Sequence, residues 1–197
     1  TISSSRTGVY FYWHHNTYST AWMKRKVYPL SGTIIENTFF TGKNWVTGDL
    51  TIQSGVTATL KAGSITYVSD STKIIVENGA TLMKERGSQI IFGAGATYQL
   101  NASLDSLWNM TGIPAVVPDF YKDAVYPTRT SNPFEYYNGY VQADTLKNDR
   151  GYWIKFGSDQ NHAYEGGFID SMAMNAYSGW NIIGSISCPI DTGLIYT

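Results

Sequence analysis

The stretch GVTATLKAGS at residues 55–64 returns as GATLMKERGS at residues 79–88 and begins again as GATYQL at residues 95–100. Each copy alternates apolar with polar residues in short runs that end at a glycine. Alternation with a period of two indicates short strands, and glycine allows the left-handed backbone with which a strand turns a corner. A repeat of this kind is typical of strands stacked in successive layers.

The repeat predicts a three-sided parallel solenoid over residues 45–100, with about three turns. We expect equivalent side chains, such as Val56, Ala80 and Ala96, to lie over one another roughly 4.8 Å apart. An antiparallel meander could use the same strands and stays open as an alternative. The solenoid is favoured because corresponding glycines return in register.

The composition points to a β-rich protein that works outside the cell. Aromatic residues make up 15% of the 197 residues and charged residues only 15%, against roughly 25% charged in ordinary soluble domains. With 14 basic and 15 acidic residues, the net charge of −1 gives no long-range attraction to nucleic acid or anionic lipid. No apolar run is long enough for a membrane span.

The repeat is flanked by two segments without its rhythm. Residues 1–44 are assigned to N-terminal strands or a cap. Residues 101–133 hold four of the six prolines, which predicts a cap or linker. A stack of strands needs a cover over its last layer, and four apolar residues of this segment are expected to supply it: Leu104, Leu107, Trp108 and Met110.

Residues 134–197 predict a small antiparallel β module rich in aromatic residues. Asn138-Gly139 is a strong hairpin signal. GYWIKF, residues 151–156, and GWNIIGSIS, residues 179–187, both alternate in the manner of strands. The predicted fold is therefore all-β, with almost no helix.

Two groups of residues resemble known secreted proteins. VTGDLTIQSGVTATLKAGS, residues 46–64, resembles the right-handed parallel β-helix segments of large bacterial surface proteins. GYWIK at residues 151–155 and GWNIIG at residues 179–184 are similar to β modules of surface proteins exported by the type IX route in Bacteroidota and Ignavibacteria. In that family the Gly-Trp-Asn element opens a repeat and the Gly-Tyr-Trp element closes one. The order is reversed here, which implies a piece of a longer polypeptide or a last strand that completes another copy.

Candidate catalytic and metal-binding residues are few. His14 and His15 are adjacent and would face opposite sides of a strand, and His162 stands alone. Cys188 is expected to be a buried apolar residue next to Pro189. The sequence thus predicts no catalytic residue, no metal site and no cofactor, and the protein is expected not to be an enzyme.

A calcium loop was weighed for the segment that contains Asp159, Asn161 and Glu165, whose oxygen atoms alternate along the chain. The segment lacks the carboxylate pattern of a calcium loop, and Gly166-Gly167 favours a plain turn.

Carbohydrate binding is the main alternative to a purely structural role. Five aromatic residues are candidates to stack on sugars: Tyr136, Tyr137, Tyr140, Trp153 and Trp180. Aromatic rings in a small β module more often fill its core. Tyr137 and Tyr140 flank the Asn-Gly turn and are expected to be the most exposed pair.

Four Asp-Ser or Asp-Thr pairs resemble the O-glycosylation acceptor of exported Bacteroidota proteins. Their hydroxyl residues are Ser71, Ser106, Thr145 and Ser171. The same pairs also start ordinary turns.

These patterns predict a non-enzymatic structural or adhesive component of a bacterial surface protein or of a self-assembling extracellular fibre. The alternative is a carbohydrate-binding module of a larger secreted protein. The expected partners are other copies of the chain, the rest of a longer polypeptide or glycans.

Overall fold

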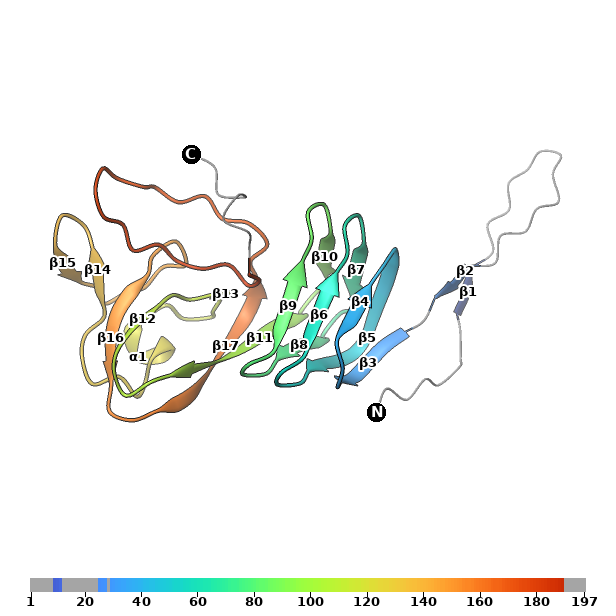
Figure 1. The fold of residues 1–197 in the computed structure, drawn as a ribbon, viewed down its shortest axis with the longest axis horizontal. Helices are drawn as coiled ribbons and strands as arrows, with labels where there is room; N and C mark the ends of the chain where they lie inside the picture. Colours follow the sequence, from blue (N-terminus) through green and yellow to red (C-terminus); the bar gives the residue numbers. More distant parts are fainter. Residues whose placement is uncertain (1–8, 12–24, 28, 190–197) are drawn as a thin grey trace.

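The computed structural model describes residues 9–11, 25–27 and 29–189. This part is nearly all β, as predicted, and its sheets are curled around two cores. Figure 1 shows the parallel strands in the middle of the molecule and a second group of strands at one end. The single helix of the described residues, α1 (Lys122–Val125), has four residues, and no helix there is long and apolar enough to cross a membrane.

Residues 29–104 form the parallel stack. Its strands are β3 (Pro29–Ile34), β4 (Thr38–Phe40), β5 (Lys43–Ile52), β6 (Thr57–Leu60), β7 (Ile65–Val68), β8 (Lys73–Val76), β9 (Thr81–Lys84), β10 (Gln89–Phe92) and β11 (Thr97–Leu104). They pair in three walls: β3-β5-β8-β11, β4-β6-β9 and β5-β7-β10. β5 serves two walls, because its first residues pair with β7 and its last residues with β8. The parallel pairing begins at β3, before residue 45.

Neighbouring strands of each wall are parallel, so the antiparallel meander is wrong for this part of the chain. Thr57 pairs with Thr81, Ile65 with Gln89 and Lys73 with Thr97. Each pair is separated by the same twenty-four residues that separate Asp49 from Lys73. From Leu50 onward, paired strands are therefore twenty-four residues apart, whereas the separation is shorter before it, as in the pairing of Thr38 with Ala58.

The corners between walls explain why glycine recurs in the repeat. They also explain why one predicted alignment of the repeat copies is wrong. Positive φ angles occur at Gly55 and Gly79 in one corner, and at Ser71 and Gly95 in another. The GA pairs at residues 79–80 and 95–96 thus begin different walls. The prediction that Ala96 lies over Ala80 is wrong, because the register that pairs Thr97 with Lys73 places Ala96 beside Thr72.

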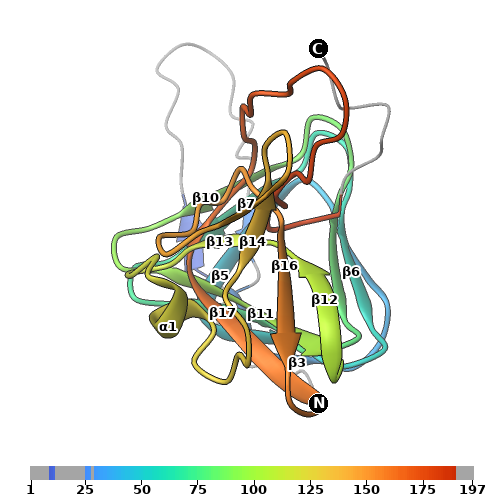
Figure 2. The same ribbon diagram turned by 90° about the vertical axis from the view of Figure 1, so that its left-hand side faces the viewer.

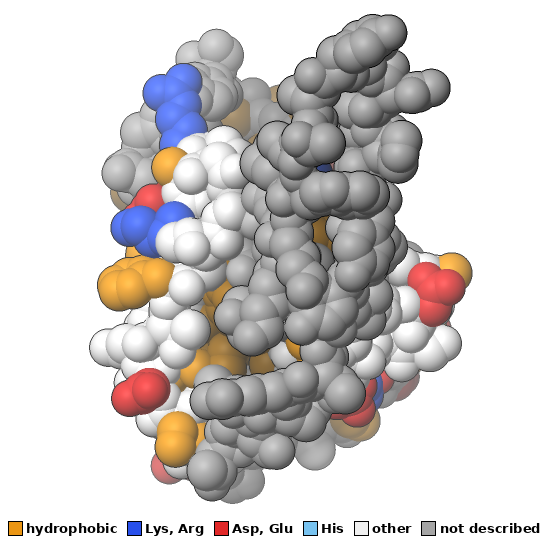
Figure 3. Space-filling view, turned by 90° about the vertical axis from the view of Figure 1, so that its right-hand side faces the viewer, with side chains coloured by type: hydrophobic (Ala, Val, Ile, Leu, Met, Phe, Trp, Pro, Cys, Tyr) orange, Lys and Arg blue, Asp and Glu red, His pale blue; other side chains and the backbone are white. Residues whose placement is uncertain are grey.

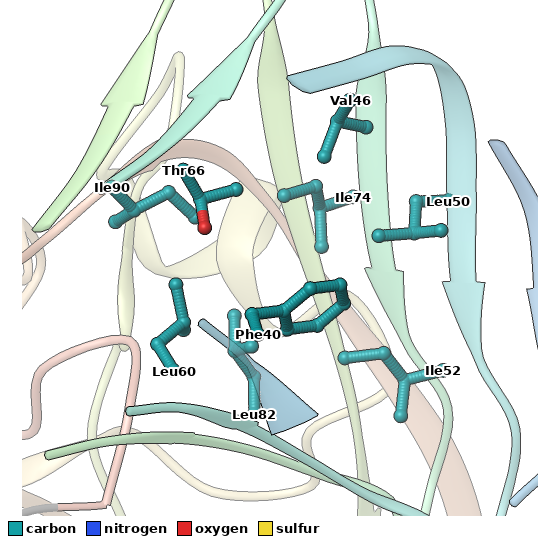
Figure 4. A pocket seen from close by; sticks show the side chains of 9 residues that line it. All are labelled: Phe40, Val46, Leu50, Ile52, Leu60, Thr66, Ile74, Leu82 and Ile90. Carbon is teal, nitrogen blue, oxygen red and sulfur yellow. The ribbon is translucent and has the colours of Figure 1, made fainter. Parts of the chain in front are cut away.

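The interior of the stack is a packed apolar core. Figure 4 shows side chains from all three walls turned toward one another, including Phe40, Leu60 and Ile74. The hollow that they enclose has a volume of about 10 Å³, which is at most the room for one water molecule. The interior therefore has no space for a ligand.

Carboxylates at the corners join successive turns. Asp49 Oδ1 accepts the N–H of Lys73 at 2.8 Å, and Asp70 Oδ1 accepts the N–H of Ala94 at 2.8 Å. Glu85 Oε2 accepts the N–H of Ala62 at 2.9 Å. A side-chain bond from Lys61, and then this backbone bond, lower the pKa of Glu85 below its usual value. Each carboxylate satisfies a backbone donor that the turn leaves without a strand partner.

Ser71 is the non-glycine residue among these corner positions, with a φ of 55°. Replacing it with glycine removes the steric cost of left-handed backbone, and we expect Ser71→Gly to stabilise the fold by about 1 kcal/mol. Urea unfolding measures the change. Gly95→Ser, one turn later in the same corner, is the matched control and is expected to destabilise by a similar amount. Equal midpoints for both variants would contradict the corner assignment.

The last turn of the stack is closed by an antiparallel strand and by an ion pair. β17 (Gln160–Phe168) pairs antiparallel with β11, from Tyr98 opposite Gly166 to Leu104 opposite Gln160. Lys84 occupies the position that Leu60 holds one turn earlier, and its ammonium group pairs with Asp170. Burial lowers the pKa of Lys84. The charged side chain of Lys84 thus replaces an apolar core residue in the last turn of the stack.

Of the four residues expected to cover that end, only Leu104 is buried. Leu107, Trp108 and Met110 are 60%, 51% and 61% exposed. The expectation is wrong for these three because residues 107–111 form a strand whose Leu107, Trp108 and Met110 side chains are exposed to solvent, and Leu104 packs in a second core.

The second core lies within residues 101–168, which we call the module. Its strands, besides β17, are β12 (Leu107–Thr111), β13 (Ala115–Val116), β14 (Phe134–Tyr136), β15 (Tyr140–Gln142) and β16 (Tyr152–Phe156). β12, β16, β14 and β15 make an antiparallel sheet in that order. The hydroxyl groups of Tyr126, Tyr164 and Thr111 contact one another inside this core.

Residues 169–189, the closing segment, run from β17 back to the stack (Figure 1). The strand expected over residues 179–187 does not form, and only Ile183 makes a bridge, to Arg150. Further on, Ser187 Oγ accepts the N–H of Ile169 and donates to the carbonyl oxygen of Pro114. The segment is therefore bonded to both cores without being a strand.

Near the N-terminus, β1 (Val9–Phe11) and β2 (Arg25–Val27) form an antiparallel pair. His14 and His15 lie outside the described residues. Figure 3 views the end at which the parallel stack begins, where hydrophobic side chains are visible near the centre and charged ones toward the outline.

Candidate functional site

The outer side of the module sheet carries a group of aromatic and apolar side chains, which we call the aromatic face. In β16, Tyr152, Ile154 and Phe156 are buried in the core, so Trp153 and Lys155 point outward as the alternation predicted. The cross-strand partners Met110 and Phe134 lie beside Trp153. The complete face consists of Trp108, Met110, Phe134, Tyr136, Tyr140, Trp153 and Trp180. Figure 2 looks onto this end of the molecule, with β12, β14 and β16 toward the viewer.

Two hollows cross the aromatic face. The first has a volume of about 530 Å³ and is lined by Trp108, Phe134, Tyr140 and Trp153. The second, of about 510 Å³, shares Tyr140 and Trp153 and reaches Trp180. Because two rings line both hollows, they form one continuous groove across the sheet. Each part has the size of a small-molecule binding site.

Trp180 is held on the rim of the groove by a bonded turn. The side chain of Asn181 accepts the N–H of Tyr177 at 2.9 Å and donates to the carbonyl oxygens of Tyr177 and Gly179 at 2.8 Å and 3.1 Å. Gly151 N–H, at the start of β16, donates to Ile182 at 3.1 Å. The indole of Trp180 is nevertheless 85% exposed. The turn thus orders the backbone at Trp180, while its large apolar ring stands in solvent.

The predicted pair Tyr137 and Tyr140 is exposed, at 53% and 63%, and the Asn-Gly hairpin between β14 and β15 forms as predicted. The structure does not bring the two rings to one site. Tyr140 lines both hollows, whereas Tyr137 packs edge-to-face on Tyr177 with ring centroids 5.1 Å apart.

Within the part of the chain that the structure describes, no charged residue lines either hollow, and Asn181 contributes an amide group. At the edge of the sheet, Asn132 Nδ2 donates to Gln142 Oε1 at 3.1 Å. The groove therefore presents aromatic faces and amide groups, and Lys155 points outward at its border, beside Trp108.

His162 lies on β17 against the module core rather than in a turn. Its ring centroid is 4.5 Å from that of Tyr164 and 5.2 Å from that of Tyr126. Burial lowers the pKa of His162 below its ordinary value of 6.5. The residue is thus a packing element that is neutral in the folded state near pH 7.

A pH dependence of stability follows. A histidine whose pKa is lowered by folding supplies stability above its unfolded pKa, and that stability is lost as the pH falls toward the folded pKa. We expect the free energy of unfolding to decrease from about pH 7.5 to about pH 5, and to decrease less in His162→Phe, which keeps the ring. Urea unfolding at both pH values measures this difference. An equal decrease in both proteins would contradict the assignment.

The residues weighed for calcium do not form a site. Asp159 Oδ1 accepts the N–H of Ser106 at 2.6 Å, Asn161 Oδ1 accepts from Asn78 at 3.0 Å, and Glu165 pairs with Lys73 at 2.5 Å. Gly166 and Gly167 lie inside β17, so the predicted plain turn is wrong. No group of three metal-ligating side chains occurs within the described residues.

Cys188 is buried in the core of the stack, as predicted. Burial raises its pKa to about 12, so the thiol stays protonated and unreactive near neutral pH.

The four hydroxyl residues of the Asp-Ser and Asp-Thr pairs, Ser71, Ser106, Thr145 and Ser171, are all exposed. Two of the preceding aspartates are bound in ion pairs, Asp144 with Lys122 and Asp170 with Lys84.

The importance of Trp108 and Met110 to the face was missed in the sequence. The signal that could have found them is the alternation of LWNMT at residues 107–111, which matches that of GYWIKF.

No family model matches the chain, and neither the curated proteins nor the solved structures give a match.

Proposed function

We propose that this protein is a non-enzymatic adhesive component of a bacterial surface or extracellular structure. In this proposal residues 29–104 are a short right-handed parallel β-helix that serves as a rigid support, and the module at its end makes the contact. The observation that carries the proposal is the aromatic face, where the exposed Trp180 is carried on a turn whose backbone is held by the bonds of Asn181. Large exposed apolar patches on soluble proteins commonly mark interaction surfaces.

The placement of the carboxylates supports a structural role. Asp49, Asp70 and Glu85 accept backbone N–H groups at the corners of the stack. Carboxylates that act as catalytic acids or bases are instead gathered in a cleft, at geometry suited to proton transfer.

Adhesion is tested with the labelled chain on immobilised extracellular materials, namely polysaccharides, mucin, collagen and bacterial cells. We expect retention on at least one material and a loss of at least about tenfold in the double variant Trp108→Ala/Trp180→Ala. The matched control is Phe39→Ala/Ile91→Ala, which removes two exposed apolar side chains from the stack. No retention on any material, or equal retention of both variants, would count against the proposal.

Self-assembly into a fibre is the second candidate. It is supported by the position of β9 and β10, each at the end of its sheet, since the edge of a sheet can receive a strand from another chain. Sedimentation velocity over a range of concentrations tests it, and a monomer at every concentration would reject it.

Modification by O-linked sugars belongs to the same proposal. The exposure of Ser71, Ser106, Thr145 and Ser171 leaves them accessible to a glycosyltransferase. The intact mass of protein secreted by its native host tests this, and a mass equal to that of the bare chain would reject it.

A further inference from the structure

We infer that the groove of the aromatic face binds a neutral polysaccharide chain. This inference rests on the proposed adhesive function and names its ligand.

The shape of the groove fits an extended polymer better than a compact ligand. Its two hollows, of about 530 Å³ and about 510 Å³, are joined at Tyr140 and Trp153. Trp108 lines one hollow and Trp180 the other. The register places Met110, Trp153 and Phe134 in one row across the sheet, and Trp108 beside Lys155 in the next row. A ligand that reaches from Trp108 to Trp180 therefore extends over both hollows and passes Tyr140 and Trp153.

The chemistry of the lining fits the two surfaces of a sugar. The faces of a pyranose carry C–H groups with a small positive charge, and the face of an aromatic ring is negative. Hydroxyl groups at the edges of the sugar require polar partners, which Asn181 and the hydroxyl group of Tyr140 supply within the hollows. The amides of Asn132 and Gln142 lie at the edge of the same sheet.

The scarcity of charged side chains in the lining of the groove favours an uncharged polymer as its ligand. The described residues that line the hollows include no Lys, Arg, Asp or Glu, and Lys155 points outward at their border, beside Trp108. Binding of a polyanion, such as nucleic acid or an acidic polysaccharide, depends on basic side chains that neutralise its charge. A neutral polysaccharide needs no such partners, so the lining and this ligand are complementary.

The turn that carries Trp180 indicates that a ligand is bound at this end of the groove. An indole that is 85% exposed gains little from burial within the chain. The backbone of its turn is nevertheless held by the side chain of Asn181, which accepts one hydrogen bond and donates two. Arg150 packs on the ring of Tyr177 at 5.7 Å and holds the start of the turn against the module. A turn whose backbone is already ordered loses less conformational entropy when a ligand binds.

Affinity electrophoresis of the whole chain tests the inference. The gels contain soluble neutral polysaccharides, namely hydroxyethyl cellulose, xyloglucan, glucomannan, mannan and arabinoxylan, with alginate and polygalacturonate as acidic comparators. We expect retardation by at least one neutral polymer, independent of salt, and a loss of about tenfold in affinity for Trp180→Ala and for Trp153→Ala. Phe39→Ala, which removes an exposed ring from the stack, is expected to bind like the native chain. Unchanged thermal midpoints verify that the variants are folded.

Three results would overturn the inference. Salt-sensitive binding to the acidic polymers alone would show an ionic site. Self-association that disappears in Trp180→Ala would identify a second copy of the chain as the occupant. Retention on mucin, collagen or cells without retardation by any neutral polymer would reject the polysaccharide but leave the adhesive function in place.

Discussion

Tyr98→Ala is expected to destabilise the protein by about 4 kcal/mol, within the range measured when large aromatic side chains are removed from cores. Tyr98 is fully buried and lies on β11 between Ile74 of the stack and Gly166 of β17. Its ring packs edge-to-face on Phe168, and its hydroxyl donates to the carbonyl oxygen of Ser187 at 2.6 Å. The substitution opens a cavity and leaves this carbonyl without its donor.

The control is Tyr98→Phe, which keeps the ring and loses only the hydrogen bond. We expect it to cost about 1 kcal/mol. Urea unfolding followed by circular dichroism and by fluorescence reports on the two substitutions. If Tyr98→Ala cost no more than Tyr98→Phe, the ring would not be packed between the stack and β17 as described.

Gly166→Ala is expected to have a comparably large effect, at least about 3 kcal/mol. A Cβ atom at this position would lie 2.0 Å from the carbonyl oxygen of Val116, on the paired strand β13. The obstacle is backbone, which cannot rotate away as a side chain can, so the two strands must separate. Overpacking of a core normally costs about 1–3 kcal/mol, and disrupting the strand pair adds to this.

Gly157→Ala is the matched control. Its Cβ atom would make an ordinary contact, 3.5 Å from Thr130, and we expect a change in unfolding free energy below about 0.5 kcal/mol. Thermal unfolding of both variants measures the difference. Equal stability of the two would contradict the close approach of β13 and β17.

The stacked strands could be predicted because one physical pattern recurs. Runs such as TATL at residues 57–60 alternate with period two, and a residue suited to left-handed backbone returns at each corner. The same pattern misled the alignment of Ala96, because all three corners of one turn look alike in sequence. The spacing of the repeat copies does not show whether the next copy lies on the next wall of the same turn or on the same wall one turn later.

The role of the corner carboxylates could not be predicted from the sequence. Their hydrogen bonds to Lys73, Ala94 and Ala62 join residues that lie on successive turns. Such contacts depend on the register of the walls, which the sequence did not establish.

The aromatic face was predicted in part. Trp153 and Tyr140 were candidates because of the alternation in β16 and the Asn-Gly turn. Trp108 was assigned to the cover of the stack, because its pairing with Lys155 joins strands that are far apart in sequence. The strand expected around Trp180 fails because the side chain of Asn181 bonds the local backbone and competes with strand pairing.

The equal spacing of paired strands from Leu50 onward makes the length of the stack adjustable in single steps. A segment of twenty-four residues, the separation of Asp70 from Ala94, adds one strand to every wall and ends at the corner where it began. Duplication of residues 53–76 within the gene would lengthen the stack by about 4.8 Å, and residue 77 would follow in an equivalent position. The reach of the aromatic face from the other end can thus evolve by tandem duplication, without any change to the groove.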